Sequence, residues 1–342
     1  MADQKLELFN KNKAKRINKN LKKLLINILI NYTVWILVLI SSIMAMVLVP
    51  RFGTGKNIIN IIVHMIPLGM TIYAMGLCLM TGFFDLSLES TYAIAPIIAV
   101  LVMTRWAPNF PGIVYIGIVI TMVVGMIVGL VNGILSVKLR INPFLVTLCM
   151  MLILRGLSLF LIPAGIFNLP KAYIFLGSYR ILNNILPVSV PCFIIVIIAL
   201  DWMIRKKPFG RHLLAVGSNE RAAYLTGIKT ELLKITIFVI AGMLAALGGL
   251  IAAGRQHAVL NSMGTGNMVL MFAGAILGGV ALRGGVGSII GVLGGIFLLQ
   301  IVSNLITLAK VNPFLIQVVY GSILLLALIL QSLRSKLRQF ID

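Results

Sequence analysis

The acidic residues that could do chemistry are few, and one pair stands out. The 342 residues include 8 acidic ones, and Asp85 and Glu89 lie four residues apart just after a long apolar run. Carboxylates inside a membrane segment are candidates for a transport pathway. The alternative role is structural, because Asp85 or Ser87 could cap the helix that follows. We favour the structural cap for Asp85 and Ser87, and keep both residues as pathway candidates.

Arg155 and a set of neutral polar residues lie within other apolar runs. For Arg155 we expect a structural role, by snorkelling or by pairing with a helix C-terminus or with Asp85, over contact with a solute. Neutral amides and hydroxyls suit a polyhydroxylated solute because they offer both donors and acceptors. Their commoner use in membranes is hydrogen bonding between helices, so both roles stay open. The neutral candidates for a pathway are Asn132, Asn142, Thr147, Ser303, Asn304 and Gln300.

Sequence motifs for catalysis, metal binding or ATP hydrolysis are not found. The segment GTGKN at 53–57 lacks the spacing and the Ser or Thr of a phosphate-binding loop. The histidines and cysteines are scattered without the spacing of a metal site: His64, His212, His257, Cys78, Cys149 and Cys192. We therefore expect no catalytic, cofactor or metal site in this chain, and no enzymatic activity.

The elements that must position these residues are membrane-spanning helices. Hydrophobic residues make up 60% of the sequence and charged residues 11%, with a mean hydropathy of +1.08. A soluble domain has roughly a quarter of its residues charged. The sequence predicts an all-α polytopic protein of the cell membrane with about ten spans. These are 24–50, 58–80, 90–103, 112–137, 142–163, 185–204, 235–254, 268–282, 286–309 and 313–333.

Basic residues predict the orientation of these spans. With both termini in the cytoplasm, 21 of the 29 Lys and Arg residues fall in cytoplasmic segments. This bias follows the positive-inside rule, and it favours topology and contact with anionic lipid over nucleic-acid binding as the reason for the net charge of +21. The predicted parts are a basic cytoplasmic tail at 1–23, a transmembrane domain at 24–333 with a cytoplasmic loop at 205–234, and a cytoplasmic tail at 334–342.

Two predicted spans, 90–103 and 268–282, are too short. A helix needs roughly 20 residues to cross the hydrocarbon core. Short spans at matched positions in two halves indicate a translocation site between inverted repeats. The alternative is that both spans are tilted or have misplaced boundaries. We expect an inverted repeat of helices two to five and seven to ten, with the pathway near the short spans.

The loop at 205–234 carries a polar, helix-forming segment, FGRHLLAVGSNERAAYLTGIKT at 209–230. Pro208 ends the preceding span, Ser218 or Asn219 is the N-cap of a short helix, and Gly227 ends that helix. A helix of about two turns is marginal by itself in water, so a partner or the membrane surface must hold it. Its expected apolar contacts are Leu214, Ala222 and Leu225.

This segment resembles the cytoplasmic coupling segment of permease subunits in bacterial ABC importers of the ribose, galactose, xylose and autoinducer-2 type. The family pattern is G-x-x-x-x-A-x-G-x-N-x-x-A-A-x-x-x-G-I, and it is met by Gly210, Ala215, Gly217, Asn219, Ala222, Ala223, Gly227 and Ile228. Similar family segments are FFDLSLES at 83–90, INPFLVTLCMMLILRGL at 141–157 and AILGGVALRGGVGSIIGVLGG at 275–295. The resemblance covers about residues 60–335. At 82–89 the chain has GFFDLSLE where the family commonly has GGIDLSVG, which leaves the solute class open.

The resemblance implies a transport function with several partners. The chain would form the pathway of an ATP-driven importer for a sugar or sugar-like solute, with nucleosides or autoinducer-type solutes as the alternative. The implied partners are a separate ATPase that carries ATP and Mg²⁺, an extracytoplasmic binding protein, a second permease subunit, identical or similar, and membrane lipid, with no nucleic acid. Coupling to the ATPase would use Gly210, Arg211, Gly217, Asn219, Glu220, Arg221, Ala222, Ala223 and Gly227.

An ion-coupled secondary transporter is the alternative of another class. Such a transporter needs a relay of titrating groups in the membrane, and acidic residues are rare in the predicted spans. A membrane scaffold without transport is a further alternative. We favour the ABC permease over both.

Overall fold

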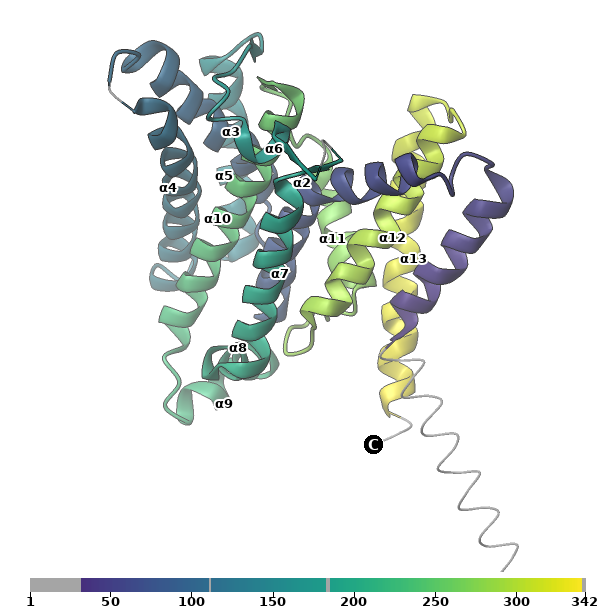
Figure 1. Ribbon diagram of the computed structural model, residues 1–342. Coiled ribbons are helices and arrows are strands. Elements are labelled where there is room, and N and C mark those ends of the chain that lie inside the picture. The colour runs from purple at the N-terminus through teal and green to yellow at the C-terminus, as the bar shows by residue number, and fades with distance from the viewer. Residues whose placement is uncertain (1–31, 111, 183–184, 340–342) are drawn as a thin grey trace, which may run out of the picture.

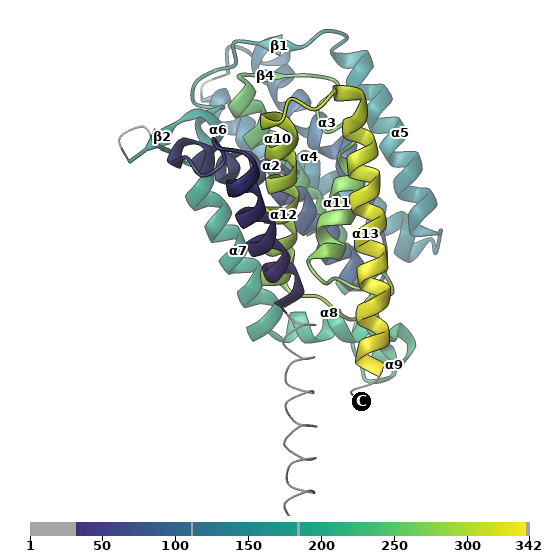
Figure 2. The same cartoon turned by 90° about the vertical axis from the view of Figure 1, so that its right-hand side faces the viewer.

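The computed structural model describes residues 32–110, 112–182 and 185–339, and these form a bundle of helices (Figures 1 and 2). Helices account for eight of the ten predicted spans. They are Tyr32–Leu48, α2 Gly55–Met80, α4 Ile113–Gly133, α5 Pro143–Leu161, α7 Ser189–Lys206, α10 Thr230–Gln256, α12 Ile289–Leu308 and α13 Pro313–Gln339.

The two short spans are also present as helices. These are α3, Leu88–Leu101, which continues as a π-helix over Val102–Trp106, and α11, Asn267–Leu277. With its π-helix, α3 has 19 residues and is long enough to cross a membrane, so the prediction that this span is too short is wrong, whereas α11 is short. Six helices in the described part of the chain are long and apolar enough to cross a membrane. The polytopic helical fold is thereby confirmed, whereas the number of spans, the side of each terminus and the inverted repeat stay predictions.

Some boundaries differ from the sequence predictions. The helix α13 continues to Gln339, so most of the tail predicted at 334–342 is helical. The helix α4 ends in a second π-helix, Ile134–Lys138, which the sequence pattern did not predict. The basic tail at 1–23 and the first part of the first span, 24–31, lie outside the described residues.

Two very short strand pairs were not predicted either. Strand β1, Ile166–Phe167, pairs antiparallel with β4, Ala258–Val259. Strand β2, Arg180–Ile181, follows the short helix α6, Phe175–Ser178, and pairs antiparallel with β3, Leu186–Pro187. The β1–β4 pair lies at the opposite end of the molecule from helices α8, Pro208–Ser218, and α9, Glu220–Leu225 (Figure 2).

The helix α10 is central, packing against α2, α3 and α4. Its contact with α4 is close because both helices place glycine there. A Cβ on Gly125 would collide with the carbonyl oxygen of Gly242, and a Cβ on Gly242 with that of Gly125. Small residues that let helix backbones approach are typical of packing in membranes. This contact holds α4 in place, and α4 carries one of the candidate pathway residues, Asn132.

Candidate functional site

The loop predicted to couple to a partner folds as two helices, α8 and α9, where one was expected. Pro208 is the first residue of α8, a position that suits proline because no helical N–H is lost. Asn219 is extended, separates the two helices, and accepts the Ala222 N–H at 3.0 Å as the N-cap of α9. Gly227, with φ of +85°, lies just beyond the end of α9. Of the two proposed N-caps, Asn219 is therefore confirmed.

The outer side of α9 is open to solvent. Tyr224 and Leu225 are 68% and 78% exposed, and Ala222 is also exposed. Ala223, predicted to contact a partner, is instead buried against the chain itself. Ala222 and Ala223 are identical residues next to each other, so the sequence alone could not show which of them faces the interior. That depends on how α9 packs against its neighbours. We call the exposed side of α9, with Arg211, the coupling face.

Two glycines predicted to contact a partner also face inward. A Cβ on Gly210 would collide with the carbonyl oxygen of Ile204 at the end of α7. A Cβ on Gly217 would collide with that of Met80, the last residue of α2. The Met80 carbonyl also accepts the Gly285 N–H at 2.9 Å, from the connection between α11 and α12. The backbone of α8 therefore touches α2 and this connection directly.

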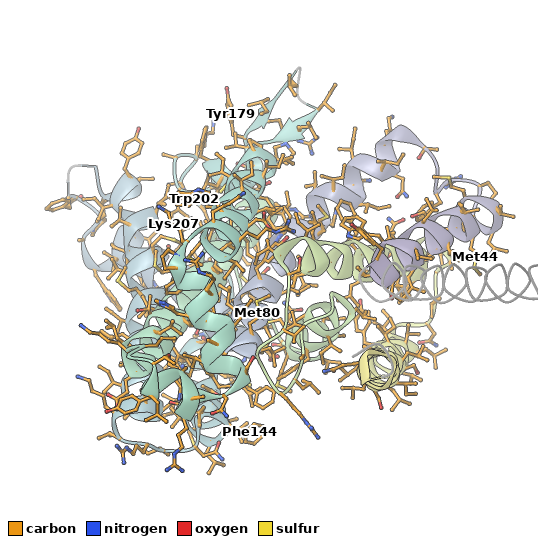
Figure 3. All side chains as sticks on the ribbon, turned by 90° about the horizontal axis from the view of Figure 1, so that it is seen from below. Met44, Met80, Phe144, Tyr179, Trp202 and Lys207 are labelled. Carbon is orange, nitrogen blue, oxygen red and sulfur yellow. The ribbon has the colours of Figure 1, made fainter. Side chains whose placement is uncertain are left out.

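Charges around α8 and α9 divide into paired and exposed groups. Glu220, predicted to contact a partner, lies 2.5 Å from Lys234 of α10. Lys207 lies over the ring of Trp202, 4.1 Å from its centroid, as Figure 3 shows from below. Arg211 and Arg221 are exposed. These two arginines remain available for a partner.

Inside the bundle, Asp85, Ser87 and Asn132 form a buried hydrogen-bonded group. The Asp85 Oδ1 accepts the Ser87 N–H at 3.0 Å and the Ser87 hydroxyl at 2.6 Å. The Asn132 amide donates to the Ser87 Oγ at 2.7 Å. Asp85 thus binds Ser87, the residue just before α3, but Ser87 makes no side-chain capping hydrogen bond to the helix, so the predicted cap is not seen. Asn132 joins this turn to α4.

This group is only partly satisfied. The Asp85 Oδ2 and the Asn132 Oδ1 are buried without a hydrogen-bond partner in the described part of the chain. Burial in the connection between α2 and α3 raises the pKa of Asp85 to about 6, against the opposing effect of hydrogen bonds from Ser87 and Asn132. Both free atoms are acceptors of hydrogen bonds, so water or a solute hydroxyl suits them.

Glu89 joins the N-terminal ends of α3 and α11. It lies in the first turn of α3. Its carboxylate accepts the N–H of Gly266 at 3.2 Å and that of Met268 at 3.0 Å, at the start of α11. A negative charge at a helix N-terminus is favourable because the N–H groups there carry partial positive charge. The N-terminal ends of α3 and α11 therefore share one carboxylate, and Asp85 and Glu89 belong to separate groups.

Arg155 completes this contact from α5. Its Nη2 lies 3.4 Å from the Glu89 Oε1. Its Nη1 donates to the carbonyls of Asn261 at 2.7 Å and Met263 at 3.2 Å, in the segment before α11. The structural role predicted for Arg155 is confirmed, but its acidic partner is Glu89 and not Asp85. We call Glu89, Arg155 and the start of α11 the polar junction.

Two neutral candidates for the pathway, Asn142 and Thr147, form hydrogen bonds within their own helix, α5. Asn142 is exposed and, as the N-cap of α5, accepts the Phe144 N–H at 2.9 Å. Thr147 is buried, and its hydroxyl donates to the Pro143 carbonyl one turn earlier at 2.9 Å. These contacts are structural, and a pathway role for either residue stays a prediction.

The candidates on α12 lie near α2. The amides of Asn304 and Asn57 donate to each other, both at 2.9 Å. This pair is the interhelical hydrogen bond expected as the alternative. Ser303 and Gln300 are half-buried, and a pathway role for them also stays a prediction. Among the described residues, no three His, Cys, Asp or Glu side chains are grouped to hold a metal ion.

Known proteins resemble the chain over most of its length. The profile of a family described as the branched-chain amino acid transport system permease component matches residues 57–330. The L-arabinose transport system permease protein AraH of Escherichia coli (strain K12) is 33% identical over 293 residues, 86% of this chain and 88% of that protein. The ribose import permease protein RbsC of Bacillus subtilis (strain 168) is 33% identical over 303 residues, 88% of this chain and 91% of that protein. No solved structure shows a significant match.

Proposed function

The chain belongs to the family of the branched-chain amino acid transport system permease component, and on this premise we propose that its solute is a sugar or a sugar-like molecule. The chain is a permease subunit, a multi-pass protein of the cell membrane that forms a translocation pathway. The sugar assignment is supported by relatives named for L-arabinose and ribose transport, each covering more than four fifths of both chains.

We propose that a separate ATPase drives this pathway, and the coupling face supports this proposal. Tyr224 and Leu225 are large apolar side chains held out in solvent on a six-residue helix. Exposed aromatic and apolar side chains next to arginines are typical of a protein contact. A partner that covers them also covers Arg221. Because α8 touches α2 through Gly217, movement of the ATPase would be passed to the membrane helices.

The pathway lies, we infer, beside α3 and α11. Broken or short helices whose N-terminal ends meet within the membrane mark solute sites in transporters. Here those ends meet at Glu89, and the Asp85 Oδ2 and Asn132 Oδ1 are acceptors without a partner among the residues that the structure describes. Acceptors of this kind suit the hydroxyl groups of a sugar. A second permease subunit would complete the pathway, and an extracytoplasmic binding protein would deliver the solute.

Uptake by the reconstituted assembly tests this proposal. The permease would be placed in liposomes with its ATPase and binding protein, and uptake of labelled L-arabinose, ribose and galactose measured with and without ATP. We expect ATP-dependent uptake of a sugar, lost in Leu225→Glu and kept in the apolar control Leu225→Met. Ala223 was also predicted to contact the ATPase, but it is buried within the chain and is therefore unsuitable for this test. Uptake that persists without ATP or without the ATPase would instead support an ion-coupled transporter.

A further inference from the structure

A cleft lies beside the coupling face, at the end of the molecule where α9 lies. Its volume is about 730 Å³, within the range of roughly 300–1,000 Å³ for clefts that bind ligands. One wall is the connection between α4 and α5, and the other is formed by α9 and the start of α10. Among its lining residues are Ser136, Arg140, Arg221, Tyr224, Glu231 and Lys234.

The charges of the cleft favour a negatively charged occupant. Glu220 and Lys234 neutralise each other on one wall. Arg140 and Arg221 stand on opposite walls and are exposed, which leaves two arginines against the single carboxylate of Glu231. The first residues of α5 and α10 also line the cleft, and helix N-terminal ends add partial positive charge.

Ser136 provides an independent sign that the cleft is filled. Ser136 lines the cleft, only 7% of the residue is exposed, and its hydroxyl oxygen is buried without a hydrogen-bond partner among the described residues. A buried hydroxyl without a partner is costly, so a polar group that enters the cleft and bonds to it would be favoured.

We propose that an acidic segment of the ATPase fills this cleft, with carboxylates between Arg140 and Arg221; this inference rests on the proposed function. The cleft is continuous with the coupling face, because Arg221 and Tyr224 belong to both. A protein that covers Leu225 therefore also reaches the mouth of the cleft. Arginine binds carboxylate through paired hydrogen bonds, which suits arginines on two walls of one cleft.

The consequence is a second point of attachment for the ATPase. Besides α8 and α9, it holds the connection between α4 and α5. Ser136 lies one turn beyond Asn132, whose amide donates to Ser87 at the start of α3. A pull on this wall of the cleft therefore reaches the buried group around Asp85 through α4.

Charge reversal at Arg140 tests the inference. The complete assembly would be placed in nanodiscs of neutral lipid, and the affinity of the ATPase for the permease measured. We expect Arg140→Glu to weaken this affinity about tenfold, because a repulsive carboxylate replaces one of the two arginines that bind the acidic segment. The control is Lys138→Glu, an exposed basic residue of the same connection that does not line the cleft, for which we expect little change.

A crosslinking experiment keeps the inference testable if Arg140→Glu does not fold. In Arg140→Lys the charge is kept and an amine is introduced, which a carbodiimide couples directly to a nearby carboxylate. Mass spectrometry should find position 140 joined to an acidic residue of the ATPase. Coupling only to Glu231 of the same chain, or to nothing, would overturn the inference.

Two further outcomes separate this inference from its alternatives. If Leu225→Glu abolishes binding of the ATPase while Arg140→Glu leaves it unchanged, the ATPase binds the coupling face but not the cleft. The inference about the cleft is then wrong, and the proposed function is kept. If Arg140→Glu has an effect only in nanodiscs with anionic lipid, and no crosslink to the ATPase forms, a lipid headgroup occupies the cleft and the inference is wrong.

Discussion

The polar junction and the coupling face use charge in opposite ways. At the junction, Glu89 and Arg155 satisfy each other and the backbone around the start of α11. At the coupling face, Arg211 of α8 and Arg221 of α9 remain exposed, and α9 also holds the exposed Tyr224 and Leu225. The interior charges fix helix ends relative to one another, whereas the exposed arginines lie where the ATPase contact is proposed. Changes inside should therefore alter stability, and changes at the face should alter coupling alone.

The strongest test of this contrast is Arg155→Ala. Removing the cation leaves Glu89 partly buried beside carbonyl groups that have lost their donor, and breaking a buried ion pair costs about 3–5 kcal/mol. We expect a clear fall in the melting temperature of the purified permease, measured by intrinsic fluorescence. Arg155→Lys should recover part of the loss. A melting temperature unchanged in both variants would mean that the junction does not hold α3 and α11.

Gly217→Ala tests the link between the two regions. The added Cβ meets the carbonyl oxygen of Met80, and overpacking of this kind costs about 1–3 kcal/mol. We expect both a lower melting temperature and weaker stimulation of the ATPase by the binding protein. Gly321→Ala on α13 is the matched control for stimulation, because no atom lies near its Cβ and it lies outside the coupling loop. Normal stimulation in Gly217→Ala would argue against transmission through this contact.

Asp85→Asn should raise stability at neutral pH. The pKa of Asp85 is raised in the folded protein, so its contribution to stability is greatest below its ordinary pKa of roughly 4 and is lost as pH rises through about 6. At pH 7.5 the neutral amide should be more stable than the carboxylate by up to about 3 kcal/mol, since one pKa unit corresponds to about 1.4 kcal/mol. Melting temperatures between pH 4 and pH 8 check this. The variant should lack the decline that the wild type shows, and a parallel decline in both would contradict the assignment.

The smallest expected change in stability is that of Arg221→Ala. An exposed side chain away from packed features changes stability by less than about 0.5 kcal/mol. Stimulation of the ATPase should nevertheless fall several-fold, and more steeply at low salt, where charge attraction is strongest. Equal stimulation in the variant and wild type at low salt would remove Arg221 from the coupling face.

Structural features that depend on residues adjacent in the sequence could be predicted, whereas contacts between residues far apart in the sequence could not. Pro208, Asn219 and Gly227 act as predicted because helix capping and termination are local. The partner of Arg155 could not be predicted, because Glu89 and Asn261 come near it only through the packing of α3, α5 and the segment before α11. The opposite exposures of Ala222 and Ala223 likewise depend on how α9 is seated. The apolar runs predict the long helices, but not the strand pairs or π-helical ends, which tertiary contacts determine.

The contact between Gly217 and the end of α2 has a mechanical consequence. Where side chains separate two helices, a small displacement of one can be absorbed by changes of rotamer. Here backbone meets backbone, and no rotatable group lies between α8 and the Met80 carbonyl. The joint is therefore stiff, so a small displacement applied at α8 should arrive at α2 with almost its full amplitude.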